Sequence, residues 1–341
     1  MSRDPHCPAG LKIRNLNISI PLALAPMVGL SHTAGRSLIQ ELGGVGMLYT
    51  EMLAAKRLPH ENAEISPMLV KSPIEKPLIY QIFLADESLV EGAIVKLEAL
   101  DADGVDVNLG CPAPQLRRSG SGGFLAEDRQ LVARIIRKIR LSTEMALTAK
   151  IRLGQKLDQE KFIDFCKMLE YEGVDLITVH GRLHGEKFCR SPRWDWIGYA
   201  KKAVNIPVLA NGGIFSVTDA KRCLEVSGAD GLMIGRGAFE NPWLFADIAV
   251  TLYGMENERQ IRSREQLFYR YVELLEARFR PERRLGRLKQ FIHYFARSFT
   301  FGHQLASSVQ TSHNMEEAVG RVALFFTQTD PSELFFDPIC V

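Results

Sequence analysis

Short apolar runs alternate with longer amphipathic stretches between residues 20 and 245, and this alternation restricts the possible fold more than any other feature. It is typical of β-α units, which assemble parallel sheets. A doubly wound sheet typically carries a GxGxxG motif after its first strand, and none follows Leu22–Pro26. We therefore predict an α/β fold with a closed parallel (β/α)8 barrel, the TIM-barrel architecture. The predicted strands are Leu22–Pro26, Met47–Glu51, Leu78–Phe83, Val105–Leu109, Ala146–Arg152, Leu176–His180, Val208–Asn211 and Leu232–Gly235.

Helices are predicted between the strands, and several of them are introduced by a Ser or Asp suited to cap a helix N-terminus. The segment Leu11–Ile20, which precedes the first strand, is predicted to form a small hairpin that closes the bottom of the barrel. The predicted helices include Asp86–Leu100, Arg129–Arg140, Asp158–Glu172, Trp194–Ala203 and Ser216–Val226.

After about residue 250 the apolar residues recur at helical spacing. The chain of 341 residues also exceeds the size that one hydrophobic core usually serves. We therefore predict two domains, a barrel over residues 1–250 and a small all-helical C-terminal domain over residues 251–341. The apolar residues at helical spacing are Leu267, Tyr271, Leu274, Leu275 and Phe279, then Leu285, Leu288, Phe291, Ile292 and Phe295, with a further helix over Val319–Phe326.

Composition limits the class of protein. Hydrophobic residues make up 46% of the chain and charged residues 24%, which argues against a disordered or fibrous protein. The start of the chain is polar, and no later stretch approaches the roughly 20 apolar residues that a membrane span requires, so we expect a cytoplasmic protein without membrane contact. The six cysteines form no CxxC motif and no metal-binding pattern with the eight histidines, so we expect neither a disulfide framework nor a metal.

The net charge of the chain is only +2, but the charge is unevenly distributed. Between Arg259 and Arg297 there are eleven Lys and Arg residues against four Glu residues, a local excess of +7. Such a cluster could bind the phosphates of a folded RNA. The alternative is that these residues form a solvent-exposed helix face, which is what most runs of charged residues form. The residues that crowd around Pro281 are Arg278, Arg280, Arg283, Arg284, Arg287 and Lys289.

Polar residues close nearly every predicted strand, at the end where barrels of this type carry their active sites. Two of these ends, Asn211-Gly212-Gly213 and Gly235-Arg236-Gly237, are rich in glycine and would present backbone N–H groups to a phosphate. Lys150 and His180 close two other strands and would lie beside the rest of that ligand. Because a lysine can stabilise the charge of a reduced flavin and a histidine can donate to its ring carbonyl, we predict a flavin site. The alternative for His180 is a core imidazole bonded to the backbone.

Cys111 lies two residues after a predicted strand, between Gly110 and Pro112, in a turn at the mouth of the barrel. A thiol is mostly protonated at neutral pH, so it can act as a general acid there. The alternative, a buried cysteine that serves as a small apolar residue, suits Cys166 and Cys223 better because both fall on predicted helices. We therefore predict that Cys111 is the catalytic acid.

Taken together, the strand ends resemble those of the tRNA-dihydrouridine synthases, and the resemblance covers both the barrel and the helical tail. The NxGCP element combined with the VHGR element is more specific for this family than any single glycine-rich loop. The motifs that carry the resemblance are Ala25-Pro26-Met27, Asp106-Val107-Asn108-Leu109-Gly110-Cys111-Pro112, Lys150-Ile151-Arg152, Val179-His180-Gly181-Arg182, Ala210-Asn211-Gly212-Gly213-Ile214 and Met233-Ile234-Gly235-Arg236-Gly237.

The resemblance implies reduction of the C5–C6 double bond of specific uridines in tRNA, with tightly bound FMN as cofactor and NADPH as reductant. It implies that hydride passes from the flavin N5 to uracil C6 while Cys111 protonates C5 from the opposite face. We further expect a monomer. The residues expected around FMN are Pro26, Met27, Gln81, Lys150, His180, Asn211, Gly213, Gly235 and Arg236, and those expected at the tRNA substrate are Asn108, Arg152, Arg182, Arg283, Arg284 and Arg287.

The chain departs from the family pattern at three places. It has Leu84 where the family often has a glycine, Pro114-Gln115 where a lysine often follows the GCP, and Leu183-His184 where a polar pair usually follows the HGR. These differences bear on the RNA contacts and the target uridine and leave the flavin residues unchanged.

Two other functions stay open at this point. A small-molecule flavin oxidoreductase of the dihydroorotate dehydrogenase type would share the barrel, FMN and a related double-bond chemistry, but the basic helical tail argues against it. A non-catalytic RNA-binding scaffold would have no need of Cys111, Lys150 or His180, and all three are present.

Overall fold

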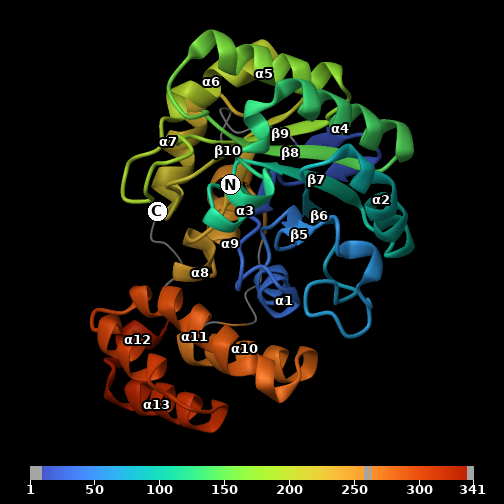
Figure 1. Ribbon diagram of the computed structural model, residues 1–341. Helices are drawn as coiled ribbons and strands as arrows, with labels where there is room; N and C mark the ends of the chain where they lie inside the picture. Colours follow the sequence, from blue (N-terminus) through green and yellow to red (C-terminus); the bar gives the residue numbers. More distant parts are fainter. Residues whose placement is uncertain (1–9, 257–260, 262, 336–341) are drawn as a thin grey trace.

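The computed structural model describes residues 10–256, 261 and 263–335. Residues 1–9, which include Cys7 and most of the polar start, lie outside the described residues, as do Arg259, Arg262 and Cys340. Figure 1 shows a barrel surrounded by helices, with the helices of the C-terminal tail grouped below it. Within the described residues, no helix combines the length and the hydropathy that crossing a membrane would need.

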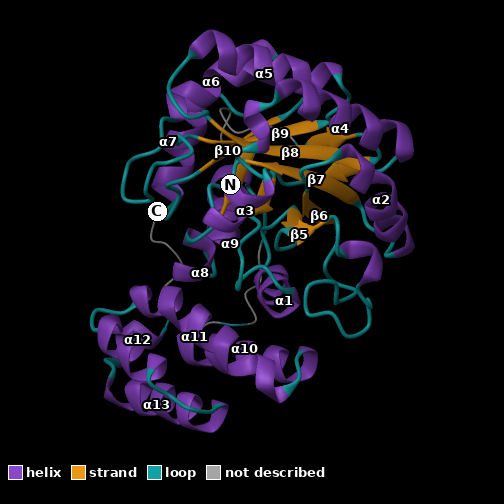
Figure 2. Ribbon diagram, viewed as in Figure 1, coloured by secondary structure: helices purple, strands orange, loops and turns teal. Residues whose placement is uncertain are grey.

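Eight parallel strands form a closed barrel, which confirms the predicted architecture. The hydrogen-bonded order is β4-β3-β11-β10-β9-β8-β7-β6, and pairing between β4 and β6 closes the ring. In Figure 2 the strands lie inside a layer of helices, which explains why nearly every strand residue is buried. The strands are β3 (Leu22–Leu24), β4 (Met47–Tyr49), β6 (Leu78–Phe83), β7 (Gly104–Leu109), β8 (Ala146–Arg152), β9 (Leu176–His180), β10 (Val208–Asn211) and β11 (Gly231–Ile234).

Two strands end two residues earlier than predicted, and both ends lie at the mouth of the barrel. The first ends at Leu24, before Pro26, which has no N–H group to donate to a neighbouring strand. The second ends at Tyr49 and is followed by a separate short strand, β5 (Leu53–Ala54), which also pairs with β6. At the break the Thr50 hydroxyl accepts a hydrogen bond from a β6 backbone N–H, so a side chain replaces the regular ladder.

Helices cover the outside of the barrel, and the predicted caps are present. The side chains of Asp128, Asp158 and Ser216 each accept a hydrogen bond from the N–H group three residues later. Helices α1, α3, α8 and α9 were not among those predicted, and α9 has too little exposed surface to show an amphipathic period. The helices are α1 (Thr33–Leu42), α2 (Val90–Ala99), α3 (Pro114–Ser119), α4 (Arg129–Ser142), α5 (Gln159–Tyr171), α6 (Trp194–Ala203), α7 (Val217–Ser227), α8 (Gly237–Glu240) and α9 (Leu244–Tyr253).

The predicted hairpin is formed by β1 (Leu11–Ile13) and β2 (Leu16–Ile18), which pair antiparallel. Its buried side chains belong to one apolar cluster with residues near the N-terminal ends of the barrel strands, such as Met47, Ala146 and Leu176. The hairpin therefore closes the bottom of the barrel, as predicted.

The tail consists of helices, which confirms the change of period after residue 250. The predicted apolar positions Tyr271 and Phe291 stack with their ring centroids 3.9 Å apart, and Phe295, Phe299 and Phe326 extend this aromatic core. The short α12 was not predicted because its nine residues bury only Gly302, Leu305 and Val309. The helices are α10 (Arg264–Arg278), α11 (Arg284–Phe295), α12 (Gly302–Gln310), α13 (Met315–Gln328) and α14 (Pro331–Leu334).

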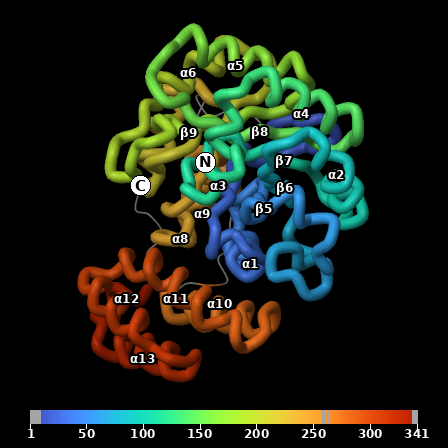
Figure 3. The backbone as a smooth tube through the Cα atoms, viewed as in Figure 1, coloured from blue at the N-terminus to red at the C-terminus, as the bar shows by residue number. Residues whose placement is uncertain are grey.

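Ion pairs and a shared core attach the tail to the barrel. Arg270 of α10 forms a bidentate pair with Glu41 of α1 at 2.7 and 2.8 Å, and Arg297 pairs with Glu240 of α8 at 2.7 Å. One continuous apolar cluster includes buried residues of both the barrel helices and the tail. Figure 3 shows the two attachment points, with α10 beside α1 and α11 beside α8.

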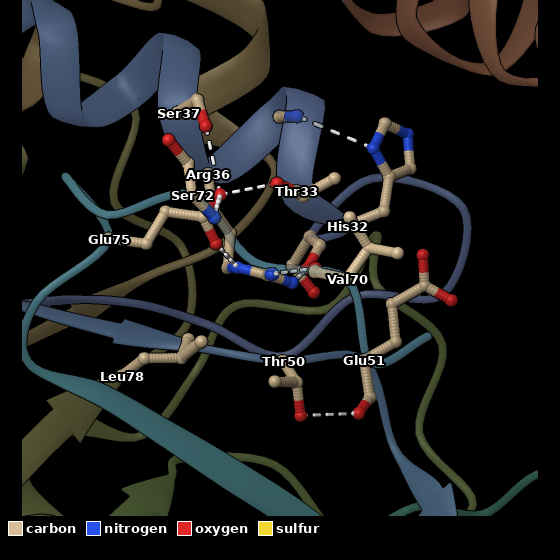
Figure 4. Close-up of polar contacts among 12 residues, drawn as sticks. His32, Thr33, Arg36, Ser37, Thr50, Glu51, Val70, Ser72, Glu75 and Leu78 are labelled. Atoms are coloured by element: carbon tan, nitrogen blue, oxygen red, sulfur yellow. Dashed lines mark hydrogen bonds and ion pairs between the residues drawn. The ribbon is translucent and has the colours of Figure 1, made fainter. Parts of the chain in front are cut away.

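A buried ionic network lies beside the tail, between α1 and the segment that precedes β6 (Figure 4). Arg36 donates from Nε to the Glu75 carboxylate at 2.6 Å, and both side chains are at most 1% exposed. Glu75 also accepts hydrogen bonds from the hydroxyls of Thr33 and Ser37 and from the backbone N–H of Ser72. The network holds the segment that precedes β6 against α1, next to the helices of the tail.

Candidate active site

A cavity of about 310 Å³ opens at the C-terminal ends of the strands. The ends of all eight barrel strands contribute to its walls, as the (β/α)8 architecture predicts. Every site residue predicted within the barrel lines this one cavity, namely Pro26, Met27, Gln81, Asn108, Cys111, Lys150, Arg152, His180, Arg182, Asn211, Gly213, Gly235 and Arg236.

The cavity is strongly cationic. Its described lining contains Lys150, Arg152, Arg182 and Arg236 and no Asp or Glu. Burial lowers the pKa of Lys150 to about 8, and the charge of Arg152 acts in the same direction. Burial and the four neighbouring cations hold the pKa of His180 well below its ordinary value, so this imidazole is neutral at pH 7. Such a lining favours an anionic ligand.

Lys150 is held in a fixed position by its neighbour on β10. Its Nζ donates to Oδ1 of Asn211 at 2.9 Å, and Nδ2 of Asn211 donates to the Met233 carbonyl at 2.7 Å. Because the carbonyl can only accept, it fixes which end of the Asn211 amide faces the lysine. Strands β8, β10 and β11 therefore position the ammonium group together.

His180 presents a defined tautomer. Its Nε2 lies 3.0 Å from Nη1 of Arg182, and a guanidinium can only donate, so Nε2 accepts and the proton resides on Nδ1. Arg182 also donates to the Phe188 and Arg190 carbonyls, so it holds the loop after β9. A side chain at Gly212 (φ +109°) would place its Cβ 2.5 Å from the imidazole, so only glycine fits there.

The predicted phosphate cradle lies at the ends of β10 and β11. Gly213 has φ +73°, and a Cβ at that position would lie 2.8 Å from Pro192. Arg236 lies between two aromatic rings, with its guanidinium carbon 4.6 Å from the centroid of Phe188 and 5.3 Å from that of Phe215. Among the described residues no carboxylate forms an ion pair with Arg236, which leaves its charge for a ligand.

A chain of side-chain hydrogen bonds positions the Cys111 turn. The carboxylate of Asp106 accepts from Nε2 of Gln81 at 2.7 Å, and Oε1 of Gln81 accepts from Nδ2 of Asn108 at 2.9 Å. Oδ1 of Asn108 then accepts from the backbone N–H groups of Gly110 and Cys111 at 3.2 and 3.0 Å. Since a carboxylate can only accept, it sets the orientation of both amides and thereby of the turn.

Sequence reasoning did not assign Asp106 or Thr148 to the site. Thr148 donates to Oδ1 of Asp106 at 2.6 Å, inside the barrel. Burial raises the pKa of Asp106 to about 6, while the hydrogen bonds from Thr148 and Gln81 act in the opposite direction. The available sequence signal was the carboxylate of Asp106 in the middle of a predicted barrel strand, where a charge is costly to bury unless it has partners.

The three predicted tail arginines lie outside the cavity and differ from one another. Arg283 is exposed. Arg284 donates to the carbonyls of Phe279 and Glu276, so it closes the C-terminal end of α10. Arg287 is half-buried, with its guanidinium carbon 4.2 Å from the ring centroid of Phe279, and its Nε is buried without a described partner.

Of the cavity residues that the sequence did not indicate, four contribute aromatic or amide side chains. Phe188 and Phe215 come from the loops after β9 and β10, and both are partly exposed. Gln290 and Tyr294 come from α11 of the tail. No motif marked the last two, because their positions depend on how the tail packs against the barrel.

Two comparisons bear on the family and the fold. Residues 23–327 match the family model described as dihydrouridine synthase (Dus). In the solved structure of a 2-naphthoyl-CoA reductase bound to 2-naphthoyl-CoA, a region covering 70% of this chain and 51% of that one aligns with a TM-score of 0.53 and 14% identity. At that identity the likeness concerns the fold alone.

Curated relatives carry the same family name. The chain is 36% identical over 232 residues to a probable tRNA-dihydrouridine synthase of Helicobacter pylori, covering 67% of this chain and 69% of that protein. It is 32% identical over 238 residues to probable tRNA-dihydrouridine synthase 1 of Synechocystis sp., covering 70% and 67%. A Mycobacterium tuberculosis relative is 29% identical over 321 residues, covering 90% and 82%. The chain therefore belongs to the dihydrouridine synthase family.

Proposed function

We propose that this chain is a tRNA-dihydrouridine synthase, which reduces the C5–C6 double bond of uridines in tRNA with FMN as bound cofactor and NADPH as reductant. The observation that carries the proposal is the composition of the cavity. Four cations, a neutral histidine and a thiol converge on it, and its described lining contains no carboxylate. This arrangement suits an anionic cofactor beside a proton donor.

The residues present fit FMN. The glycines after β10 and β11 lie where a Cβ would meet other protein atoms, so the backbone there is bare and can present N–H groups to a phosphate, and Arg236 supplies an uncompensated charge beside them. Lys150 and the Nδ1–H of His180 offer donors to the polar edge of a flavin ring. When bound, FMN supplies the hydride that is added to uracil.

The remaining hydrogen is a proton, and this chain has a group to deliver it. Cys111 Sγ donates its proton to C5, the carbon that becomes basic once C6 has received hydride, and solvent then restores the thiol. Asn108 holds the backbone of Cys111, so the donor has a fixed position before the nucleotide arrives. The base itself must leave its stack in the RNA to reach the cavity.

We propose that residues 251–341 form the tRNA-binding domain. Because Arg284 and Arg287 make contacts within the protein, the exposed Arg280 and Arg283 are better placed to meet phosphates. Each phosphate contact of this kind releases counterions, so affinity falls with salt.

We expect the double replacement of Arg280→Glu and Arg283→Glu to weaken tRNA binding at every salt concentration. Loss of two phosphate contacts lowers the slope of log affinity against log salt by about two. Filter binding from low to moderate salt measures this slope. The control is Lys12→Glu with Lys202→Glu, two exposed lysines at the hairpin and on α6. Equal slopes in the two variants would show that the exposed tail arginines are merely solvated.

The activity itself is tested with the purified protein, NADPH and an unmodified tRNA transcript. We expect flavin absorbance bands in the protein and a mass gain of two hydrogen atoms in particular uridines of the transcript. Orotate in place of tRNA should leave the reduced flavin unreacted, which separates this function from the small-molecule alternative. Reduction of the flavin by NADPH without any mass gain in tRNA would contradict the proposal.

A further inference from the structure

Helix α11 of the tail presents one continuous face to the mouth of the barrel. Arg287, Gln290 and Tyr294 are spaced by three and four residues, so they lie along the same side of the helix. Gln290 and Tyr294 line the cavity that holds Cys111 and Lys150. The cavity wall therefore includes part of the tail.

Two contacts fix this face against barrel loops. The Gln290 side chain packs over Gly29, after β3, where a Cβ would lie 3.2 Å from Cγ of Gln290. Next to α11, Arg297 is paired with Glu240 of α8, and its guanidinium carbon lies 5.4 Å from the ring centroid of Tyr294. Both side chains are therefore held before any ligand binds.

A third contact is electrostatic. Glu51, which follows β4, is 5% exposed, and its Oε1 is buried without a described hydrogen-bond partner. Burial raises the pKa of Glu51, while the nearby charge of Arg287 acts to lower it. In Figure 4 the carboxylate of Glu51 points away from the Arg36 network, as does His32, which contacts Tyr271 and Phe279 of the tail.

The barrel segments that interact with α11 and with Arg297 follow β4, β3 and β11, which are neighbouring strands in the barrel. The Cys111 turn follows β7, and Lys150 lies on β8, across the ring from β3. Helix α11 therefore faces the proton donor across the opening. Gln290 packs over Gly29, and the preceding Val28 is 59% exposed and lines the cavity, so these side chains border the opening through which a nucleotide would enter.

We infer that α11 is part of the substrate site, with Gln290 and Tyr294 contacting the nucleotide that enters the cavity. The inference rests on the proposed function and names the substrate contacts of that site. An amide offers a donor and an acceptor to a base or ribose, and a tyrosine ring offers a stacking surface. Neither side chain carries a charge, so neither is suited to hold a cofactor phosphate in place of the glycine-rich loops.

The direct test is photocrosslinking with tRNA transcribed with 4-thiouridine. Because trypsin cleaves after Lys289 and Arg297, and no Lys or Arg lies between them, Gln290 and Tyr294 fall in one peptide covering 290–297. We expect irradiation to attach nucleotide to this peptide. Crosslinks confined to other peptides would overturn the inference, even where the protein forms dihydrouridine normally.

Single replacements provide a second readout. In Tyr294→Ala, the single-turnover oxidation of reduced flavin by saturating tRNA should slow by roughly 5- to 150-fold, the range that loss of base–aromatic stacking gives. Flavin content, flavin reduction by NADPH and tRNA affinity should stay within about twofold of the parent, because the cofactor loops and exposed arginines are unchanged. Gln290→Ala should slow the same step less, and Tyr294→Phe should retain the parent rate.

The matched control is Tyr269→Ala, which removes a partly exposed tyrosine of α10 that does not line the cavity. A parent-like rate in both Tyr294→Ala and Gln290→Ala would overturn the inference, and so would a loss of activity that merely follows loss of flavin. If the parent protein itself forms no dihydrouridine while 4-thiouridine still attaches to peptide 290–297, the proposed function fails and the nucleotide contact stands.

Discussion

Replacement of Cys111 by alanine should lower dihydrouridine formation by roughly 10²- to 10⁴-fold, the usual contribution of a positioned general acid. The carbon that has to be protonated can then collect its proton only from water. The backbone contacts of residue 111 do not involve the thiol and are retained, so the turn and the cavity should persist. Single-turnover oxidation of the reduced flavin by tRNA measures the loss directly.

Flavin content, reduction by NADPH and tRNA affinity should be unchanged in Cys111→Ala. Cys189→Ala is the matched control, because Cys189 is an exposed thiol in the loop after β9 that does not line the cavity. If tRNA oxidises the reduced flavin equally fast in Cys111→Ala and in the parent, Cys111 is not the acid.

Replacement of Glu75 by alanine should lower the free energy of unfolding by about 3–5 kcal/mol, the cost of leaving one buried charge without its partner. Arg36 is 1% exposed and would lose its carboxylate, and the Thr33 and Ser37 hydroxyls would lose their acceptor. Urea unfolding followed by circular dichroism measures the change.

The control for this change is Glu87→Ala, which removes a half-exposed partner of Arg134 and should cost less than about 1 kcal/mol. Replacing both members, as in Arg36→Met with Glu75→Leu, should recover much of the lost stability because no charge is then left unpaired. A loss in Glu75→Ala no larger than in Glu87→Ala would show that the network contributes little.

The barrel could be predicted from sequence because each strand is short, apolar and closed by polar residues. Parallel strands end at one rim, so residues as distant as Pro26 and Arg236 could be placed in one site without knowledge of their contacts. The details of the rim could not be predicted in this way. That Arg182 holds His180 and its own loop, rather than standing free, depends on where the residues after it fold back.

The tail shows the limit of charge counting. Its basic character was evident, but Arg284 and Arg287 are turned toward the protein, because the C-terminal end of α10 and the ring of Phe279 offer them partners. No motif marks Gln290 or Tyr294 as site residues. They line the cavity only because α11 packs against the barrel. The sequence showed that Asp106 places a carboxylate inside a barrel strand. Its role is explained only by the positions of Gln81 and Thr148, which both donate hydrogen bonds to it.

The attachment of the tail to the barrel affects which uridine of an RNA can reach Cys111. With Arg270 tied to Glu41, Arg297 tied to Glu240 and one core running through both parts, the span from the exposed tail arginines to Cys111 has a set length. Under the proposed function, RNA phosphates bound by these arginines would therefore select the base that lies at that distance from them. We then expect RNAs of unlike sequence but equal shape to be equivalent substrates, and we expect one base pair inserted between the bound phosphates and the target uridine to move that uridine out of reach.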